Sequence, residues 1–178
     1  MDRRIARVNF SSAGGTAADG AKTCKVTLPT SWIKKLGIDE NHREVEISFE
    51  EDRIMINRRM TGAEFAERKL ALKHDVRLLS YYDRAGVCTI IYVDFTDKTL
   101  IAENFVNDPV KTAFGNNKLP TWEDFMAFLE DRCVSRHRAG LRDYLETIGL
   151  CEYDPVLIIS KTAGRMAEDS QWLKMEML

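Results

Sequence analysis

The strict alternation of apolar and polar side chains near residue 50 constrains the fold of this chain more than any other feature. Residues 44–49 alternate with a two-residue period, which is typical of a β-strand with one buried face. Glu50–Asp52 supplies a polar turn, and residues 53–58 return as a second arm. The pattern predicts an antiparallel β-hairpin with an apolar side and a polar side.

A strand, a proline and a short helix precede this hairpin. Residues 5–10 alternate as a strand, and residues 24–28 predict a second strand. Pro29 cannot donate to a strand ladder but is tolerated at a helix start, so it separates the second strand from a helix. That helix is expected over residues 30–36 and is closed by Gly37, because glycine tolerates the left-handed conformation.

Residues 24–38, 43–49 and 53–56 resemble the core of the AbrB/MazE/SpoVT swapped-hairpin DNA-binding family. The resemblance covers residues 5–59, about a third of the chain. It implies a β-barrel-type homodimer module in which the short strands of two intertwined chains bury their apolar faces together. Surface-to-volume scaling agrees, because a unit of about 55 residues has a marginal core without a partner.

The resemblance also implies that basic residues of the strand–helix segment bind double-stranded DNA. Lys25 and Lys34 match the basic pattern of the family by position, and Lys35 and Arg7 are neighbours with the right charge. Such residues would neutralise phosphates and place the dimer on the duplex. The family has two adjacent basic helix positions, and Ile33 stands at the first of them, so a dimerisation module without DNA contact remains the alternative.

No catalytic site or cofactor is predicted. Residues 11–23 are small, polar and rich in glycine, which indicates a loop. Within it, Gly15–Thr23 approaches a P-loop, but it has one residue too many before the lysine, and a strand follows where a P-loop needs a helix. His137 and Asp131 could serve as an acid–base pair for RNA cleavage, but no further catalytic residues accompany them.

Charge divides the chain into two parts. Residues 1–62 carry 11 Lys/Arg and 9 Asp/Glu, whereas the remainder carries 15 and 19. The difference suggests two units with different partners, although ordinary scatter of surface charge would explain it equally well. We expect a swapped-hairpin domain over residues 1–60, a connecting helix over residues 61–74 and a C-terminal domain over residues 75–178.

The C-terminal part predicts an α+β domain, an antiparallel β-meander with helices. Strands are expected at residues 76–82, 87–95 and 98–105, separated by turn residues. Helices are expected at residues 121–133, 137–148 and 155–162, the first with a capping-box pattern at Thr121 and Asp124. The stretch 162–173 is expected to form a turn into a terminal segment that Trp172 anchors.

The densest basic cluster of the chain lies in this acidic part. Residues 132–142 contain four arginines and one histidine. Arg132, Arg136 and Arg138 are candidates for binding phosphate, an RNA backbone or an acidic protein surface. Internal ion pairing is the alternative. The acidic residues considered for it are Glu130, Asp131 and Asp143.

Residues 75–174 resemble a recurrent domain of small uncharacterised proteins from Firmicutes and their mobile elements. They resemble more weakly the N-terminal segment of HipA-like toxins, in which an arginine-rich turn leads into a short helix and ends in Asp-x-x-Trp, here Asp169 and Trp172. The kinase motifs of those toxins are absent, so the resemblance implies no phosphotransfer.

The remaining composition excludes several classes of site. The cysteines are far apart, which predicts free cytosolic thiols. No set of four zinc ligands is apparent, so no metal is expected. No apolar run reaches the roughly 18 residues of a membrane span, and no apolar segment follows the basic first residues as in a secretory signal. We therefore expect a cytoplasmic protein. The cysteines are Cys24, Cys88, Cys133 and Cys151.

These observations lead to two functional hypotheses. The first is a DNA-binding homodimer, an autoregulator or antitoxin-like protein, whose C-terminal domain binds a protein partner. The alternative is a mobile-element inhibitor of a host defence complex, of the anti-CRISPR type, whose N-terminal module serves dimerisation or autoregulation.

Overall fold

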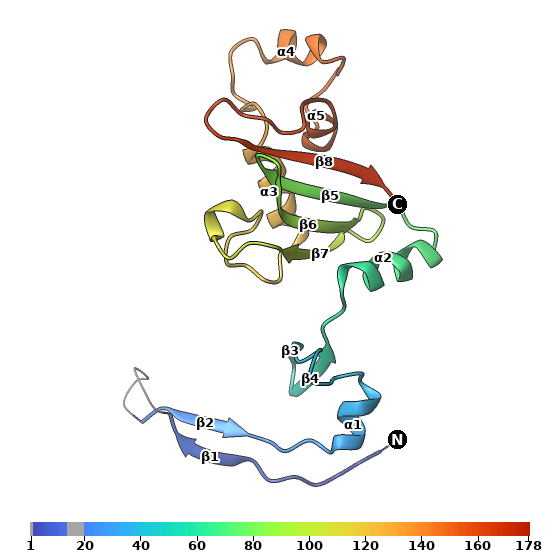
Figure 1. Cartoon of the computed structure of the whole chain (residues 1–178), viewed down its shortest axis with the longest axis vertical. Helices are drawn as coiled ribbons and strands as arrows, with labels where there is room; N and C mark the ends of the chain where they lie inside the picture. The colour runs from blue at the N-terminus through green and yellow to red at the C-terminus, as the bar shows by residue number, and fades with distance from the viewer. Residues whose placement is uncertain (1, 14–19) are drawn as a thin grey trace. The chain divides into compact units, whose positions relative to one another are not determined.

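The computed structural model describes residues 2–13 and 20–178 and separates into two compact units (Figure 1). Unit 1 comprises residues 1–59, and unit 2 comprises residues 60–178. Residues 14–19 hold much of the predicted glycine-rich loop and of the segment that approaches a P-loop, and they lie outside the described residues.

Unit 1 contains two separate two-stranded antiparallel sheets and one short helix. Strands β1 (Asn9–Ser12) and β2 (Lys22–Lys25) form the first sheet, and β3 (Val45–Glu50) and β4 (Arg53–Arg58) form the second. Helix α1 (Thr30–Lys35) begins directly after Pro29. The predicted hairpin and helix are confirmed, and Gly37 has the expected positive φ of 69°. The described residues form no closed barrel.

The first two strands differ from the sequence prediction in their bounds. The ladder between β1 and β2 begins at the pair Asn9–Lys25. Residues 5–8 and 26–28 therefore lie outside any strand, although their sequence favours one. Because these two segments are not paired within one chain, the observed strands do not include all the residues that the alternating pattern predicts.

Unit 2 is built on a four-stranded antiparallel sheet with the order β7-β6-β5-β8. Its strands are β5 (Val76–Asp83), β6 (Gly86–Asp94), β7 (Thr99–Asn104) and β8 (Gln171–Met177). The predicted meander of β5, β6 and β7 is confirmed. Strand β8 was not predicted, because the end of the chain was expected to be a turn and an anchor. Trp172 of β8 does pack on the sheet, where its ring stacks on Tyr82 at 4.2 Å.

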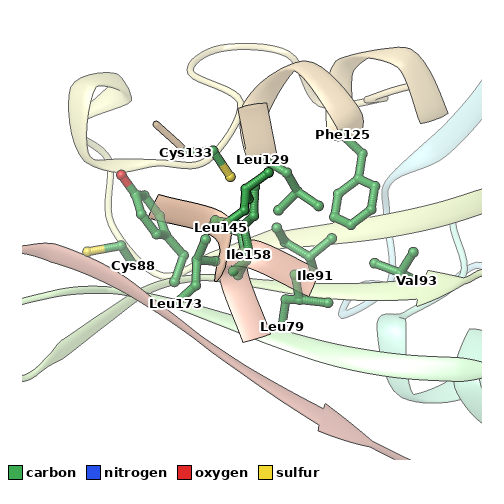
Figure 2. Packing of buried hydrophobic residues seen from close by; sticks show 12 residues of the cluster. Leu79, Cys88, Ile91, Val93, Phe125, Leu129, Cys133, Leu145, Ile158 and Leu173 are labelled. Atoms are coloured by element: carbon green, nitrogen blue, oxygen red, sulfur yellow. The ribbon is translucent and has the colours of Figure 1, made fainter. Parts of the chain in front are cut away.

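The main core of unit 2 lies on one face of this sheet (Figure 2). Leu79 and Ile91 project from neighbouring strands toward Phe125 and Leu129 of one helix and Ile158 of another, and all five are fully buried. The helices of unit 2 beyond the meander are η1 (Pro109–Lys111), α3 (Trp122–Asp131), α4 (Leu141–Thr147) and α5 (Pro155–Thr162). The capping box predicted for Thr121 and Asp124 is present.

Helix α2 (Gly62–Ala71) covers part of the opposite face of the sheet. Tyr92 alternates with Ile91 along β6 and so projects away from the main core. A Cβ atom on Gly62 would lie 2.0 Å from the Tyr92 ring, and the Gly62 amide donates to Glu103 Oε1 at 2.6 Å. Phe65 completes this small buried contact, which fixes α2 to the sheet of unit 2.

Candidate nucleic-acid interface

None of the described residues of unit 1 is buried, although its hairpin has a strongly apolar side. Ile47 lies opposite Ile56, and Phe49 lies opposite Ile54, so these four side chains share one side of the β3–β4 ladder. Ile47, Phe49 and Ile54 are 65%, 71% and 70% exposed. The side that the sequence predicts to be buried is therefore open to solvent in a single chain.

The β1–β2 ladder places Phe10 and Lys25 on opposite sides. Phe10 lies opposite Cys24, and Asn9 lies opposite Lys25. Successive residues of a strand point to opposite faces, so Lys25 projects from the side opposite Phe10. Lys25 is exposed, and Phe10 is 66% exposed. Lys22, opposite Ser12, shares the side of Phe10, so the first ladder carries one lysine on each side.

The other predicted DNA-contacting residues are also exposed. Lys34 and Lys35 occupy the last turn of α1, where cations are favoured by the helix dipole. Lys35 Nζ lies 3.1 Å from Asp2 Oδ2, in an ion pair whose two members are both well exposed. Arg7 lies exposed in the irregular segment before β1. An exposed pair of this kind stabilises a protein little, so Lys35 is available to phosphate.

Charge is sharply segregated within unit 1. Residues 2–38 contain seven Lys/Arg and two Asp/Glu, whereas residues 39–52 contain one Lys/Arg and seven Asp/Glu. All four predicted DNA-contacting residues belong to the basic segment. A polyanion is attracted by the segment that holds β1, β2 and α1 and repelled by residues 39–52. Residues 53–59, which include β4, carry three arginines and no acidic residue. The charge count over residues 1–62 combines the basic and the acidic segment, so it does not show this difference.

The three arginines proposed as a second binding site do not form one site. Arg132 is buried, with 8% exposure, and its guanidinium donates to Gly164 O at 2.8 Å, to Gln171 O at 2.8 Å and to Asp169 Oδ1 at 3.0 Å. The guanidinium lowers the pKa of the Asp169 carboxyl. Arg132 thus joins the end of α3 to the turn before β8, and its partner Asp169 is none of the three acidic residues considered above.

The other two arginines are at the surface. Arg136 pairs with Glu130 at 2.5 Å and lies over the Tyr153 ring, 4.3 Å from its centroid, so the internal pairing considered for the cluster applies to it. Arg138 lies 5.9 Å from the centroid of the Tyr144 ring. Of these three arginines, Arg138 alone has no ion pair among the described residues.

His137 and Asp131 line one surface cavity of about 370 Å³, together with Arg136 and Tyr153. No hydrogen bond joins His137 to Asp131 among the described contacts, so the structure supplies no oriented acid–base pair. The cavity also contains the Glu130–Arg136 ion pair, so Asp131 leaves its lining with one net negative charge when His137 is neutral.

One cluster with metal-ligand chemistry was missed by the sequence analysis. Ligand atoms of His74, Asp94 and Asp97 lie within 4.8 Å of one another. The Lys69 ammonium lies 2.9 Å from Asp94 Oδ2 and 2.7 Å from Asp97 Oδ2 and therefore takes the cation position between them. The spacing Asp94-x-x-Asp97 was the only local signal, because His74 and Lys69 join it through the packing of α2.

The buried Asp94 is the strongest electrostatic feature of this cluster. Burial by itself raises the pKa of its carboxyl, but hydrogen bonds from His74 and Lys69 and from the Asp97 and Thr96 amides outweigh burial and lower the pKa to about 2. The cluster thus holds an ionised carboxylate between α2 and the turn after β6, and its role is structural.

The four cysteines are free thiols, as predicted. Cys24 and Cys151 are exposed, and Cys88 and Cys133 are buried. Burial raises the pKa of the Cys133 thiol to about 12, so this sulfur stays protonated and packs as a small apolar group.

Comparison with protein-family models, with curated proteins and with solved structures found no significant match for this chain. Within the described residues, no helix combines the length and the apolar character that crossing a bilayer requires.

Proposed function

We propose that the chain is a DNA-binding homodimer, an autoregulator or antitoxin-like protein, in which unit 1 binds duplex DNA and unit 2 binds a protein partner. The observation that carries this proposal is the open apolar side of the β3–β4 hairpin in a unit whose described residues are all at least partly exposed. Full burial of each of Ile47, Phe49 and Ile54 is worth about 1.5–3 kcal/mol, which is a strong drive for association.

A second copy of unit 1 is the occupant that fits this surface. A two-fold interface joins the same patch of both chains, and the apolar side of the hairpin is self-complementary in character. Residues 5–8 and 26–28 have strand-like patterns without a strand partner in one chain. Ile5 is 98% exposed. Pairing these segments between two chains would extend the ladders and close the swapped-hairpin barrel that the family resemblance implies.

The charge segregation supports DNA as the ligand of the dimer. Lys25, Lys34, Lys35 and Arg7 all lie in the basic segment, and Lys25 projects from the side of the β1–β2 ladder opposite Phe10. Two copies double the number of cations that can neutralise phosphates along one duplex.

Fluorescence anisotropy tests this proposal with the full chain, its own upstream DNA and a scrambled duplex. We expect preference for the upstream DNA and an affinity that falls steeply as salt rises, because counterions are released from each neutralised phosphate. The double variant Lys25→Ala/Lys34→Ala should reduce the magnitude of the log–log salt slope by about four, one for each lysine of the dimer. The control Arg43→Ala, in the acidic segment, should keep the wild-type slope.

Two outcomes would contradict the proposal. Absence of binding at low salt would leave unit 1 as a dimerisation module. An unchanged slope in the lysine variant, with wild-type stability, would place the DNA on another surface.

A further inference from the structure

The two edges of the unit 2 sheet differ in how much of their backbone is paired. On the β8 edge, the Leu173 amide donates to Ala163 O, and Gln171 O accepts from Arg132. On the β7 edge, no described residue hydrogen-bonds to the outward backbone groups. Exposed edges of this kind are usually covered, because they accept further strands.

The open backbone groups of β7 can be assigned from its register. The Phe105 amide donates to Cys88 O on β6, and hydrogen-bonded pairs alternate along an antiparallel ladder. The N–H and C=O groups of Leu100, Ala102 and Asn104 therefore point away from β6. They repeat every two residues, about 7 Å apart, which is the spacing that an added strand would match.

A groove runs beside the start of this edge. It has a volume of about 400 Å³ and lies between β7 and the N-terminus of α3, with Leu100, Pro120 and Trp122 as its apolar lining. Lys98 and Glu123 line it as well, and neither has an ion pair among the described residues. Leu119, next to Pro120, is 62% exposed and extends the apolar surface.

We propose that the groove and the β7 edge bind an extended peptide segment of a partner protein, which adds as a fifth strand and places an apolar side chain against Leu100 and Trp122. Main-chain hydrogen bonds would supply affinity, and the groove would select the side chain. Because Lys98 and Glu123 both line the groove, an acidic residue of the peptide is favoured beside Lys98 and a basic residue beside Glu123.

A second copy of unit 2 is a poorer occupant of this edge. Strand β7 has six residues, and edge-to-edge pairing along it would bury far less than the roughly 1,200 Å² of a stable protein–protein interface. A peptide needs only the edge and the groove. This inference rests on the proposed partner binding by unit 2 and is independent of DNA binding by unit 1.

A phage-displayed library of random peptides, selected on the full chain, tests the proposal. Selected peptides should lose at least about tenfold in affinity for Ala102→Pro, which removes one outward amide and leaves the β6 ladder intact. The matched control Met177→Pro removes an outward amide from the other edge and should bind within about twofold of the wild type. Lys98→Glu should weaken peptides that carry an acidic residue.

Amide hydrogen exchange of the wild-type chain provides a measurement that does not depend on the variants. We expect fast exchange at Leu100, Ala102 and Asn104 in the free protein and slow exchange once a selected peptide is bound. The proposal is overturned if no peptide is enriched, if these amides stay unprotected, or if a folded Ala102→Pro protein binds like the wild type. In each case, unchanged binding of upstream DNA would leave the role of unit 1 standing.

Discussion

The Arg132 side chain holds together segments of unit 2 that are far apart in sequence. Its guanidinium contacts Gly164 and Gln171 backbone carbonyls and the Asp169 carboxylate, 37 residues away. Asp169 itself is exposed, so the main cost of removing Arg132 is the loss of the donor to the Gly164 and Gln171 carbonyls, about 1–3 kcal/mol for each group left unsatisfied. Arg132 thus contributes to folding, whereas the sequence had suggested a surface role.

Replacing Arg132 should therefore destabilise unit 2. We expect Arg132→Met to lower the free energy of unfolding by about 1–3 kcal/mol, because the Gly164 and Gln171 carbonyls lose their hydrogen-bond donor. The control Arg142→Met removes an exposed pair with Glu146 and should change the free energy by less than about 0.5 kcal/mol. Urea denaturation followed by circular dichroism measures both. Equal stability of the two variants would refute the internal role.

The Asp94 carboxylate predicts a defined pH dependence of stability. Its pKa is lowered from 3.8 to about 2 in the folded protein, so its contribution of about 2 kcal/mol is fully present above pH 3.8 and is lost as the pH falls through about 2. Urea denaturation at a series of pH values should show a smaller acid loss in Asp94→Asn than in the wild type. The exposed control Asp131→Asn should follow the wild-type profile, and identical profiles for all three proteins would contradict the assignment.

At the level of elements, the docking of α2 depends on the absence of a side chain at Gly62. A Cβ there would lie 2.0 Å from the Tyr92 ring. We expect Gly62→Ala to destabilise unit 2 by about 1–3 kcal/mol, because α2 or the ring must shift. Gly86→Ala is the matched control, since its nearest neighbour is 3.6 Å away. Thermal unfolding measures both variants, and a wild-type midpoint for Gly62→Ala would show that α2 is not tightly packed.

The elements that could be predicted from the sequence are those with local signals. The hairpin of β3 and β4, the meander of β5 to β7 and the capping box of α3 all follow from alternation, turn residues or an N-cap within a few residues. Strand β8 also alternates, at Leu173, Met175 and Met177, but its partner β5 lies about ninety residues earlier. A strand that closes a sheet from so far along the chain is specified by tertiary packing.

In the candidate site, too, local features could be predicted from the sequence, whereas contacts between distant segments could not. Exposed lysines on a strand and a helix end follow from local pattern, so the exposure of Lys25 and Lys34 could be predicted. The burial of Arg132 could not, because a run of arginines does not reveal which of them meets a distant carboxylate. The contact of His74 with Asp94 likewise depends on where α2 packs.

At the scale of the whole molecule, the two units differ in how much of their apolar surface is buried. Unit 2 buries a continuous core on one sheet face and a smaller contact under α2. Unit 1 exposes its apolar hairpin side, and none of its described residues is buried. We propose that a second copy covers the apolar side of unit 1, which would present the basic segment twice to one duplex.

Sedimentation velocity of the full chain over a wide range of concentration tests this central claim most directly. We predict one species with twice the chain mass of 20.4 kDa. Ile47→Glu should convert it to a monomer, because a charge is placed on the apolar side, whereas Glu46→Lys, on the opposite side of the same strand, should remain dimeric. A wild-type chain that stays monomeric at every concentration would contradict the account.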